Sequence, residues 1–152
     1  NLGYDNALNT GFRIAASEGF KYIITMDADG QHDSASIIKI RNLLIDGFDL
    51  VVASRRKKQR FSEEIFSFYS SLRWSLNDPL SGFKGYRISL YHSLGHFDSY
   101  KSIGTELLFY ALKNKFKVVE IEAKIKSRIG NSRFGDSLKT NLKILRAILL
   151  SF

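Results

Sequence analysis

The sequence predicts a mixed α/β domain in which helices flank a mainly parallel sheet. Short apolar runs alternate along the chain with segments whose apolar residues recur at helical spacing. Residues 20–54 form one strand–helix–strand unit of the length that a parallel crossover needs. The chain has 152 residues, which fits one domain, and 44% of them are hydrophobic, which is enough for a buried core and excludes a disordered chain.

The first half of the chain is expected to form two helices, each followed by a short strand. In the helical segments apolar residues recur every three to four positions, and a glycine follows the last of them. The strand segments are short and apolar, which is typical of buried parallel strands. Asp33 or Ser34 is suited to cap the second helix, because its side-chain oxygen can accept a bond from a free backbone N–H. The four elements are expected at residues 5–18, 20–26, 34–46 and 48–54.

The second half of the chain is less regular. A basic run, residues 55–60, precedes an aromatic-rich segment with helical spacing, and the only proline lies in an expected turn, residues 77–82. The strand expected near the end has apolar residues on one face and charged residues on the other, so one face should be buried and the other solvated. The expected elements are a helix at 62–76, a strand at 83–87, a helix at 104–113, a strand at 117–126, a basic glycine-containing loop at 127–136 and an amphipathic helix at 137–152.

Composition and charge exclude several classes of protein. The chain has no cysteine, which excludes a disulfide scaffold, a thiolate zinc site and a cysteine nucleophile. No apolar run approaches the ~18 residues of a membrane-spanning helix. Residues 1–53 carry 4 basic and 7 acidic side chains, whereas residues 54–152 carry 19 and 8, for a total net charge of +8. The basic second half favours an anionic partner such as nucleic acid, phospholipid head groups or a diphosphate-bearing substrate.

Two carboxylates, Asp27 and Asp29, directly follow the first expected strand. Ligand sites in open α/β sheets lie beyond the carboxyl ends of strands, so both side chains would project into a crevice at the sheet edge. Carboxylate oxygens are the ligands that Mg²⁺ and Mn²⁺ prefer, and such sites leave positions open for substrate phosphates. An EF-hand loop starting at Asp27 is excluded, because its sixth and twelfth residues are His32 and Ile38. A turn with two solvated aspartates is the simpler alternative.

Four segments in this order and spacing resemble the family-two glycosyltransferases of the GT-A fold. They are ITMDADGQH (24–32), DLVVASR (49–55), DPLSGFKGYR (78–87) and the segment from Gly104 to Gly135. The resemblance is strongest to the dolichyl-phosphate mannose synthase-like and polyprenyl-phosphate glycosyltransferase branch, and the opening NLGYDNALNTGF resembles the first helix of that family. It implies a Rossmann-like GT-A sheet and a hexosyltransferase. Such an enzyme would move a hexose, with inversion and with Mg²⁺ or Mn²⁺, from a GDP- or UDP-linked sugar to a polyprenyl or dolichyl phosphate.

The same resemblance implies roles for particular residues. The implied metal-binding residues are Asp27, Asp29 and Gln31, with Asp29 the most direct ligand. The implied catalytic residues are Asp78, Arg55 and Arg128, and the implied substrate-binding residues are Ser81, Gly82, Glu106 and Arg133. Asp78 would act as general base on a sugar hydroxyl, or would orient and weakly assist an acceptor that is already an anion. A carboxylate such as that of Glu106 is also favoured at a helix start by the helix dipole alone.

The chain opens directly before a helix, whereas a domain of this kind usually begins with a strand. We therefore expect a partial glycosyltransferase catalytic domain that lacks its first strand. Its expected parts are a metal-binding βαβ part at 1–54, an acceptor-side part at 55–136 and a C-terminal amphipathic helix at 137–152.

Two other functions are compatible with parts of the sequence. A haloacid-dehalogenase-like phosphatase also places two aspartates after a strand, but it expects Thr or Val at Gln31. A basic nucleic-acid-binding module would explain the positive second half and leave Asp27 and Asp29 unexplained. For the glycosyltransferase we expect no nucleic acid partner and a cytoplasmic location, with peripheral contact at the cytoplasmic membrane face. The aromatic residues of 61–76 would cover a lipid, rest on the bilayer or belong to the core.

Overall fold

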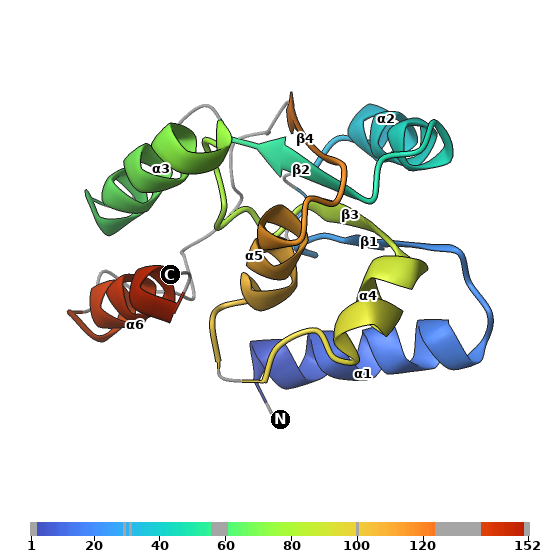
Figure 1. Ribbon diagram of the computed structural model, residues 1–152, viewed down its shortest axis with the longest axis horizontal. Helices are drawn as coiled ribbons and strands as arrows, with labels where there is room; N and C mark the ends of the chain where they lie inside the picture. The colour runs from blue at the N-terminus through green and yellow to red at the C-terminus, as the bar shows by residue number, and fades with distance from the viewer. Residues whose placement is uncertain are drawn as a thin grey trace.

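The computed structural model describes residues 3–28, 30, 32–55, 61–99, 101–123 and 138–150. These residues form a four-stranded sheet covered by helices on both faces, with a pair of helices packed beside it (Figure 1). The elements in chain order are α1 (Tyr4–Ser17), β1 (Tyr22–Thr25), α2 (Ser34–Ile45), β2 (Leu50–Ser54), α3 (Phe61–Trp74), β3 (Lys84–Arg87), α4 (Ile88–Leu94), α5 (Glu106–Lys113), β4 (Val118–Glu122) and α6 (Leu138–Leu150).

The strand order is β1-β3-β2-β4, and three of the four strands run in the same direction. This confirms the mixed, mainly parallel sheet. The expected strand–helix–strand unit suggests that β1 and β2 are neighbours. They are not, because β3 lies between them and is antiparallel to both. Gly85 explains how α2 crosses this inserted strand: a Cβ at that position would lie 2.2 Å from Ile40 Cγ2 and 3.0 Å from Leu44 Cδ1. The missing side chain lets the helix pack directly on β3.

Strand β2 is buried on both faces, as its continuous apolar run predicts. Leu50 and Val52 contact one core cluster, to which α1, α4 and α5 contribute. Val51 and Ala53 point to the other face and contact a second cluster, which α2 supplies. The central position of β2 brings its carboxyl end, at Ser54, to the middle of the sheet edge where a ligand site is expected.

Helices α3 and α6 lie side by side, left of the sheet in Figure 1. Their shared core also includes α5, and its buried members are Phe66, Phe109, Ile144, Ala147 and Ile148. Phe66 and Phe109 stack with ring centroids 5.6 Å apart. The aromatic segment after the basic run therefore contributes to the core on one side, and on its other side Phe61, Phe68 and Leu72 are exposed.

One helix, α4, was not expected from the sequence. It has only seven residues, begins directly after β3 without a break, and its N-cap position, Arg87, makes no side-chain capping bond, so no start signal marks it. Gly95 ends it in the left-handed conformation, with φ 86°. The remaining elements lie at the expected places with ends shifted by a few residues, and the basic segments 56–60 and 127–136 lie outside the described residues. No helix in the described part of the chain is long and apolar enough to span a membrane.

Candidate active site

Asp27 and the turn at residues 78–82 come together at the end of β1. Thr25, the last residue of β1, donates a hydrogen bond from Oγ1 to the carbonyl oxygen of Gly82 at 2.9 Å. A Cβ at Gly82 would lie 3.2 Å from Asp27 Oδ2 and 3.3 Å from Oδ1, so the carboxylate lies directly against the glycine backbone. The two motifs are 55 residues apart in the sequence and share one site because glycine leaves room for the aspartate.

Arg55 and Asp78 form a buried bidentate pair at the end of β2. Arg55 Nε donates to Asp78 Oδ2 at 2.9 Å, and Nη2 donates to Oδ1 at 3.0 Å. The backbone N–H of Arg55 donates to the same carboxylate at 3.0 Å. The Asp78 side chain is 2% exposed and that of Arg55 23%. Parallel bonds of this kind fix the plane of the guanidinium as well as its position.

A second carboxylate, Glu63 of α3, reaches the same arginine, with 3.5 Å between Arg55 Nη2 and Glu63 Oε2. Burial alone would lower the pKa of Arg55, but its hydrogen bonds to Asp78 and the charges of nearby carboxylates raise the pKa above its ordinary value. The guanidinium therefore stays charged while partly buried. This charge, held at the carboxyl end of β2, is suited to bind a phosphate.

Lys84 is a buried cation of this site that the sequence analysis did not select. It is the first residue of β3 and is 3% exposed. Burial lowers the pKa of Lys84 to about 8, an effect that the negative charges of Asp78 and Asp27 partly oppose. The sequence gives no signal for this burial, because a lysine in a strand is ordinarily expected to face solvent.

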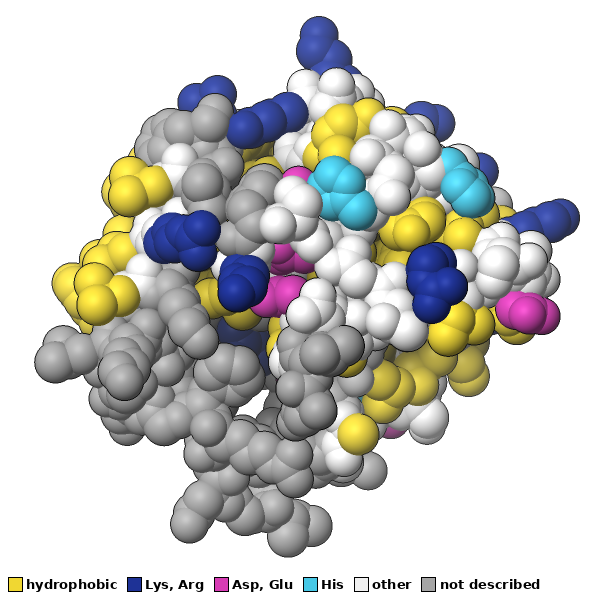
Figure 2. Space-filling model, turned by 90° about the horizontal axis from the view of Figure 1, so that it is seen from below, with side chains coloured by type: hydrophobic (Ala, Val, Ile, Leu, Met, Phe, Trp, Pro, Cys, Tyr) yellow, Lys and Arg dark blue, Asp and Glu magenta, His cyan; other side chains and the backbone are white. Residues whose placement is uncertain are grey.

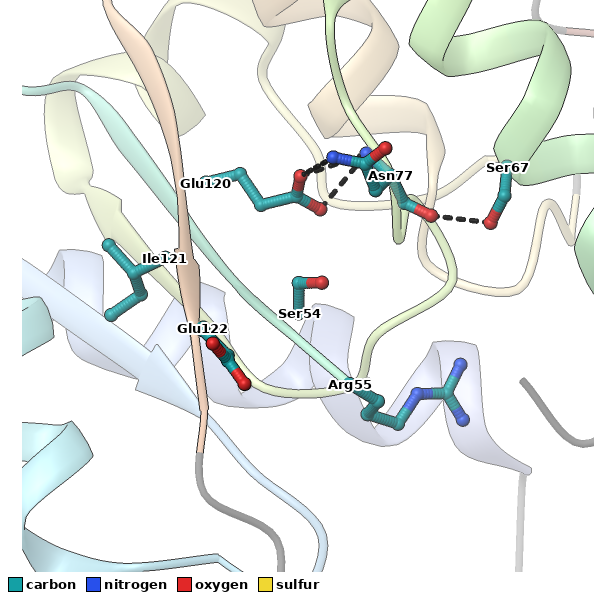
Figure 3. Close-up of a pocket in the computed structure, with 7 residues that line it drawn as sticks. All are labelled: Ser54, Arg55, Ser67, Asn77, Glu120, Ile121 and Glu122. Atoms are coloured by element: carbon teal, nitrogen blue, oxygen red, sulfur yellow. Dashed lines mark hydrogen bonds between the residues drawn. The ribbon is translucent and has the colours of Figure 1, made fainter. Parts of the chain in front are cut away.

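A pocket of about 510 Å³ opens beside Arg55, where the parallel strands β2 and β4 end (Figure 3). Its lining residues come from both strands, from α3 and from Asn77 at the start of the turn that carries Asp78. They are Ser54, Arg55, Ser67, Asn77, Glu120, Ile121 and Glu122. Placement at the carboxyl ends of adjacent parallel strands is the usual location of a ligand site in an open α/β sheet. Glu120 and Glu122 were expected only as the solvated face of a strand.

Comparison with protein families decides between the functions left open by the sequence. The family model "Glycosyl transferase family 2" matches residues 1–107. The chain belongs to this family. Membership favours the glycosyltransferase over the haloacid-dehalogenase-like phosphatase and the nucleic-acid-binding module.

Relatives of this family-two chain include an uncharacterized protein of Methanocaldococcus jannaschii, 28% identical over 166 aligned residues, which cover 99% of this chain and 68% of that protein. Two solved structures of glucosyl-3-phosphoglycerate synthase from Mycobacterium tuberculosis are also similar. The complex with phosphoglyceric acid has a TM-score of 0.73 at 16% identity, and the complex with Mn²⁺, uridine diphosphate and phosphoglyceric acid has 0.74 at 17%. The match covers 99% of this chain and 55% and 54% of the synthase chains. These likenesses confirm the GT-A fold.

Two residues predicted to bind substrate in this family-two domain have their polar atoms engaged internally. Ser81 is 1% exposed, and its hydroxyl donates to the carbonyl oxygen of Ala53 at 2.6 Å, which ties the turn to β2. Glu106, at the start of α5, lies 2.7 Å from His96 Nε2 and accepts a bond from the hydroxyl of Ser99 at 2.9 Å. Both groups order the backbone around them, and their roles toward a substrate stay predictions.

The other predicted family-two site residues lie outside the described part of the chain. They are Asp29, Gln31, Arg128 and Arg133. Within the described ranges no three His, Asp or Glu side chains are grouped as metal ligands. Asp27 is exposed, and its carboxylate is an oxygen donor of the kind that Mg²⁺ and Mn²⁺ prefer. Asp27 can thus supply one ligand of the predicted metal site. The complete ligand set of Asp27, Asp29 and Gln31 stays a prediction.

Proposed function

We propose that this chain is part of a hexosyltransferase that moves a hexose from a nucleotide-diphosphate sugar to the phosphate of a polyprenyl or dolichyl lipid. Membership of glycosyl transferase family 2 supports the transfer reaction. The synthase of similar fold binds uridine diphosphate, Mn²⁺ and phosphoglyceric acid, which supports a nucleotide-linked donor, a divalent cation and an acceptor that carries a phosphate. A UDP-linked donor is therefore favoured over a GDP-linked one.

The observation that carries the acceptor proposal is the arrangement of Asp78. Its buried carboxylate is bound on both oxygens by Arg55, so it is a poor proton acceptor. An acceptor hydroxyl would need a general base, whereas a phosphate oxygen is already an anion and attacks without one. Asp78 would then serve to hold Arg55 in place, instead of acting as the general base that a sugar hydroxyl would need.

In the proposed reaction a phosphate oxygen of the acceptor attacks the anomeric carbon of the sugar. The new carbon–oxygen bond forms as the bond to the donor diphosphate breaks, with inversion, and the nucleoside diphosphate leaves with the electron pair. Arg55 would bind phosphate oxygens at the end of β2. Asp27, with Asp29 and Gln31, would hold Mg²⁺ or Mn²⁺, and the bound cation would stabilise the charge that develops on the leaving group.

An exposed apolar surface on α3 and α6 supports a lipid acceptor and peripheral contact with the cytoplasmic membrane face. Its most exposed members are Phe61, Phe68, Leu72, Leu142 and Leu149, which are 64–77% exposed. Figure 2 shows hydrophobic side chains along this side of the molecule, with Lys and Arg side chains beside them. A protein surface with adjacent apolar and basic side chains is suited to bind a membrane that contains anionic lipid.

The test is an assay of the complete protein with UDP- and GDP-linked hexoses against a short-chain polyprenyl phosphate, phosphoglyceric acid and an oligosaccharide. We expect transfer to the polyprenyl phosphate, loss of transfer on metal removal, and a decrease of about 100-fold or more in Asp29→Ala, because a bound cation supplies several kcal/mol. Transfer to the oligosaccharide alone would exclude the phosphate acceptor. Unchanged transfer in Asp29→Ala would exclude the metal role. Release of phosphate without any sugar nucleotide would support the phosphatase instead.

A further inference from the structure

The carboxylate of Glu120 binds the turn that carries Asp78. Its Oε1 accepts the backbone N–H of Asp78 at 2.7 Å, and its Oε2 accepts the backbone N–H of Asn77 at 2.9 Å. The side-chain amide of Asn77 donates to Oε2 as well, at 2.8 Å. Three N–H groups from two consecutive residues thus converge on one side chain. Figure 3 shows the bonds that Asn77 makes to Glu120.

The position of Glu120 on β4 explains why one residue can hold this turn. Strand β4 is parallel to β2, and Glu120 pairs with Val52, three residues before Arg55. The neighbouring Ile121 points to the opposite face, into the core under α2. Glu120 therefore projects from a rigid strand toward the pocket, where its charge strengthens the hydrogen bonds that it accepts.

The hydrogen bonds of Glu120 are connected through Asp78 to the Arg55–Asp78 pair at the end of β2. They hold the backbone of Asp78, and the carboxylate of Asp78 in turn holds three N–H groups of Arg55. A displacement of the turn would move the carboxylate and rotate the guanidinium that is aligned on it. The turn is also held on its other side, where the hydroxyl of Ser67 on α3 donates to the carbonyl oxygen of Asn77.

We propose that Glu120 is a positioning residue, which sets the orientation of Arg55 through the turn at Asn77 and Asp78. The inference rests on the proposed function in one respect, namely that Arg55 binds a phosphate in the transfer reaction. Glu120 itself is not expected to touch the reacting atoms. Substitution of Glu120 should therefore lower activity only while the Asp78 carboxylate is present. A residue that only stabilises the fold would show no such dependence on Asp78.

The first test compares Glu120→Gln with Glu18→Gln in the complete protein. Both variants remove one negative charge, and Glu18 is an exposed residue at the end of α1. In Glu120→Gln the turnover number should fall about 10-fold, as is usual for groups that orient a catalytic side chain, with little change in the KM for the sugar nucleotide. Glu18→Gln should leave turnover unchanged. In an Asp78→Asn background, Glu120→Gln should cause no further loss. Full turnover in Glu120→Gln, or additive losses in the double variant, would overturn the proposal.

The second test does not depend on activity. The Nε–H of Arg55, bound to Asp78, should give a shifted and slowly exchanging signal in ¹H–¹⁵N spectra, assigned by its loss in Arg55→Lys. We expect this signal to be lost in Glu120→Gln and retained in Glu18→Gln, and retention in both would overturn the positioning role. If the wild-type protein transfers no sugar to any acceptor, the proposed function fails while this signal still tests Glu120. Should Glu120→Gln fail to fold, Asn77→Ala removes one of the three N–H donors and should weaken the same signal.

Discussion

The buried amine of Lys84 should make the stability of the protein rise with pH between about pH 7 and 9.5. Burial lowers the pKa of Lys84 to about 8 in the folded chain, from an ordinary value of 10.5. Between these values the unfolded chain binds more protons than the folded one, so the free energy of unfolding increases with pH. Below about pH 7 Lys84 is protonated in both states, and the full cost of burying the charge is present.

The size of this effect follows from the difference between the two pKa values. The fall of the Lys84 pKa from 10.5 to about 8 corresponds to a change of about 3 kcal/mol in the free energy of unfolding. Of this total, about 2 kcal/mol should appear between about pH 7 and 9.5. The window ends there because burial raises the pKa of Tyr86, and a buried tyrosine lowers stability once the unfolded chain begins to lose its phenolic proton, near pH 10.

The measurement is urea unfolding at several pH values and constant ionic strength, with Lys84→Met as the matched control. The variant has no amine to titrate, so the wild type should gain about 2 kcal/mol relative to it from about pH 7 to 9.5. All other titrating groups are common to both proteins and cancel in the comparison. Parallel curves for the two proteins would show that the amine of Lys84 is solvated, which would refute this account of the site.

Two further predictions concern packing and charge. Arg55→Ala should lower the free energy of unfolding by about 3 kcal/mol, because it leaves the Asp78 carboxylate buried without its guanidinium. A loss below about 1 kcal/mol in urea unfolding would contradict the buried pair. Gly85→Ala should cost about 1–3 kcal/mol, because its Cβ would lie 2.2 Å from Ile40 Cγ2. Gly11→Ala in α1, where nothing lies within 4 Å, is the control and should not destabilise, so equal melting temperatures for both variants would disprove the close packing of α2 on β3.

The residues at the ends of the expected strands were accessible to sequence reasoning. Asp27 and Arg55 each follow a short apolar run, and such runs end where ligand sites of α/β sheets lie. The DPLSG turn carries the proline and glycine that mark a turn, so Asp78 and Gly82 could be selected as well. The resemblance to family-two glycosyltransferases, which the family match confirms, supplied their expected roles, and those roles stay predictions.

Lys84 and Glu120 show why the rest of the site was not accessible. Both belong to strands, where a charged side chain is expected to face solvent, and alternation along the strand places Glu120 on the polar face. Their roles depend on partners far away in the sequence: Glu120 holds a turn 42 residues earlier, and Lys84 is buried among groups from three other segments. A local sequence pattern does not show which distant residues come into contact in the folded chain.

Local periodicity and turn residues were enough to determine the α/β class, the order of most helices and strands, and the two aspartate-bearing motifs, because these depend on neighbours within a few residues. The folded arrangement alone shows that β3 enters between β1 and β2, that Gly82 lies against Asp27, and that Glu120, Asp78 and Arg55 form one connected set. These features arise from contacts between segments tens of residues apart. Their free energy depends on the fit of side chains that only the packed sheet and helices bring together.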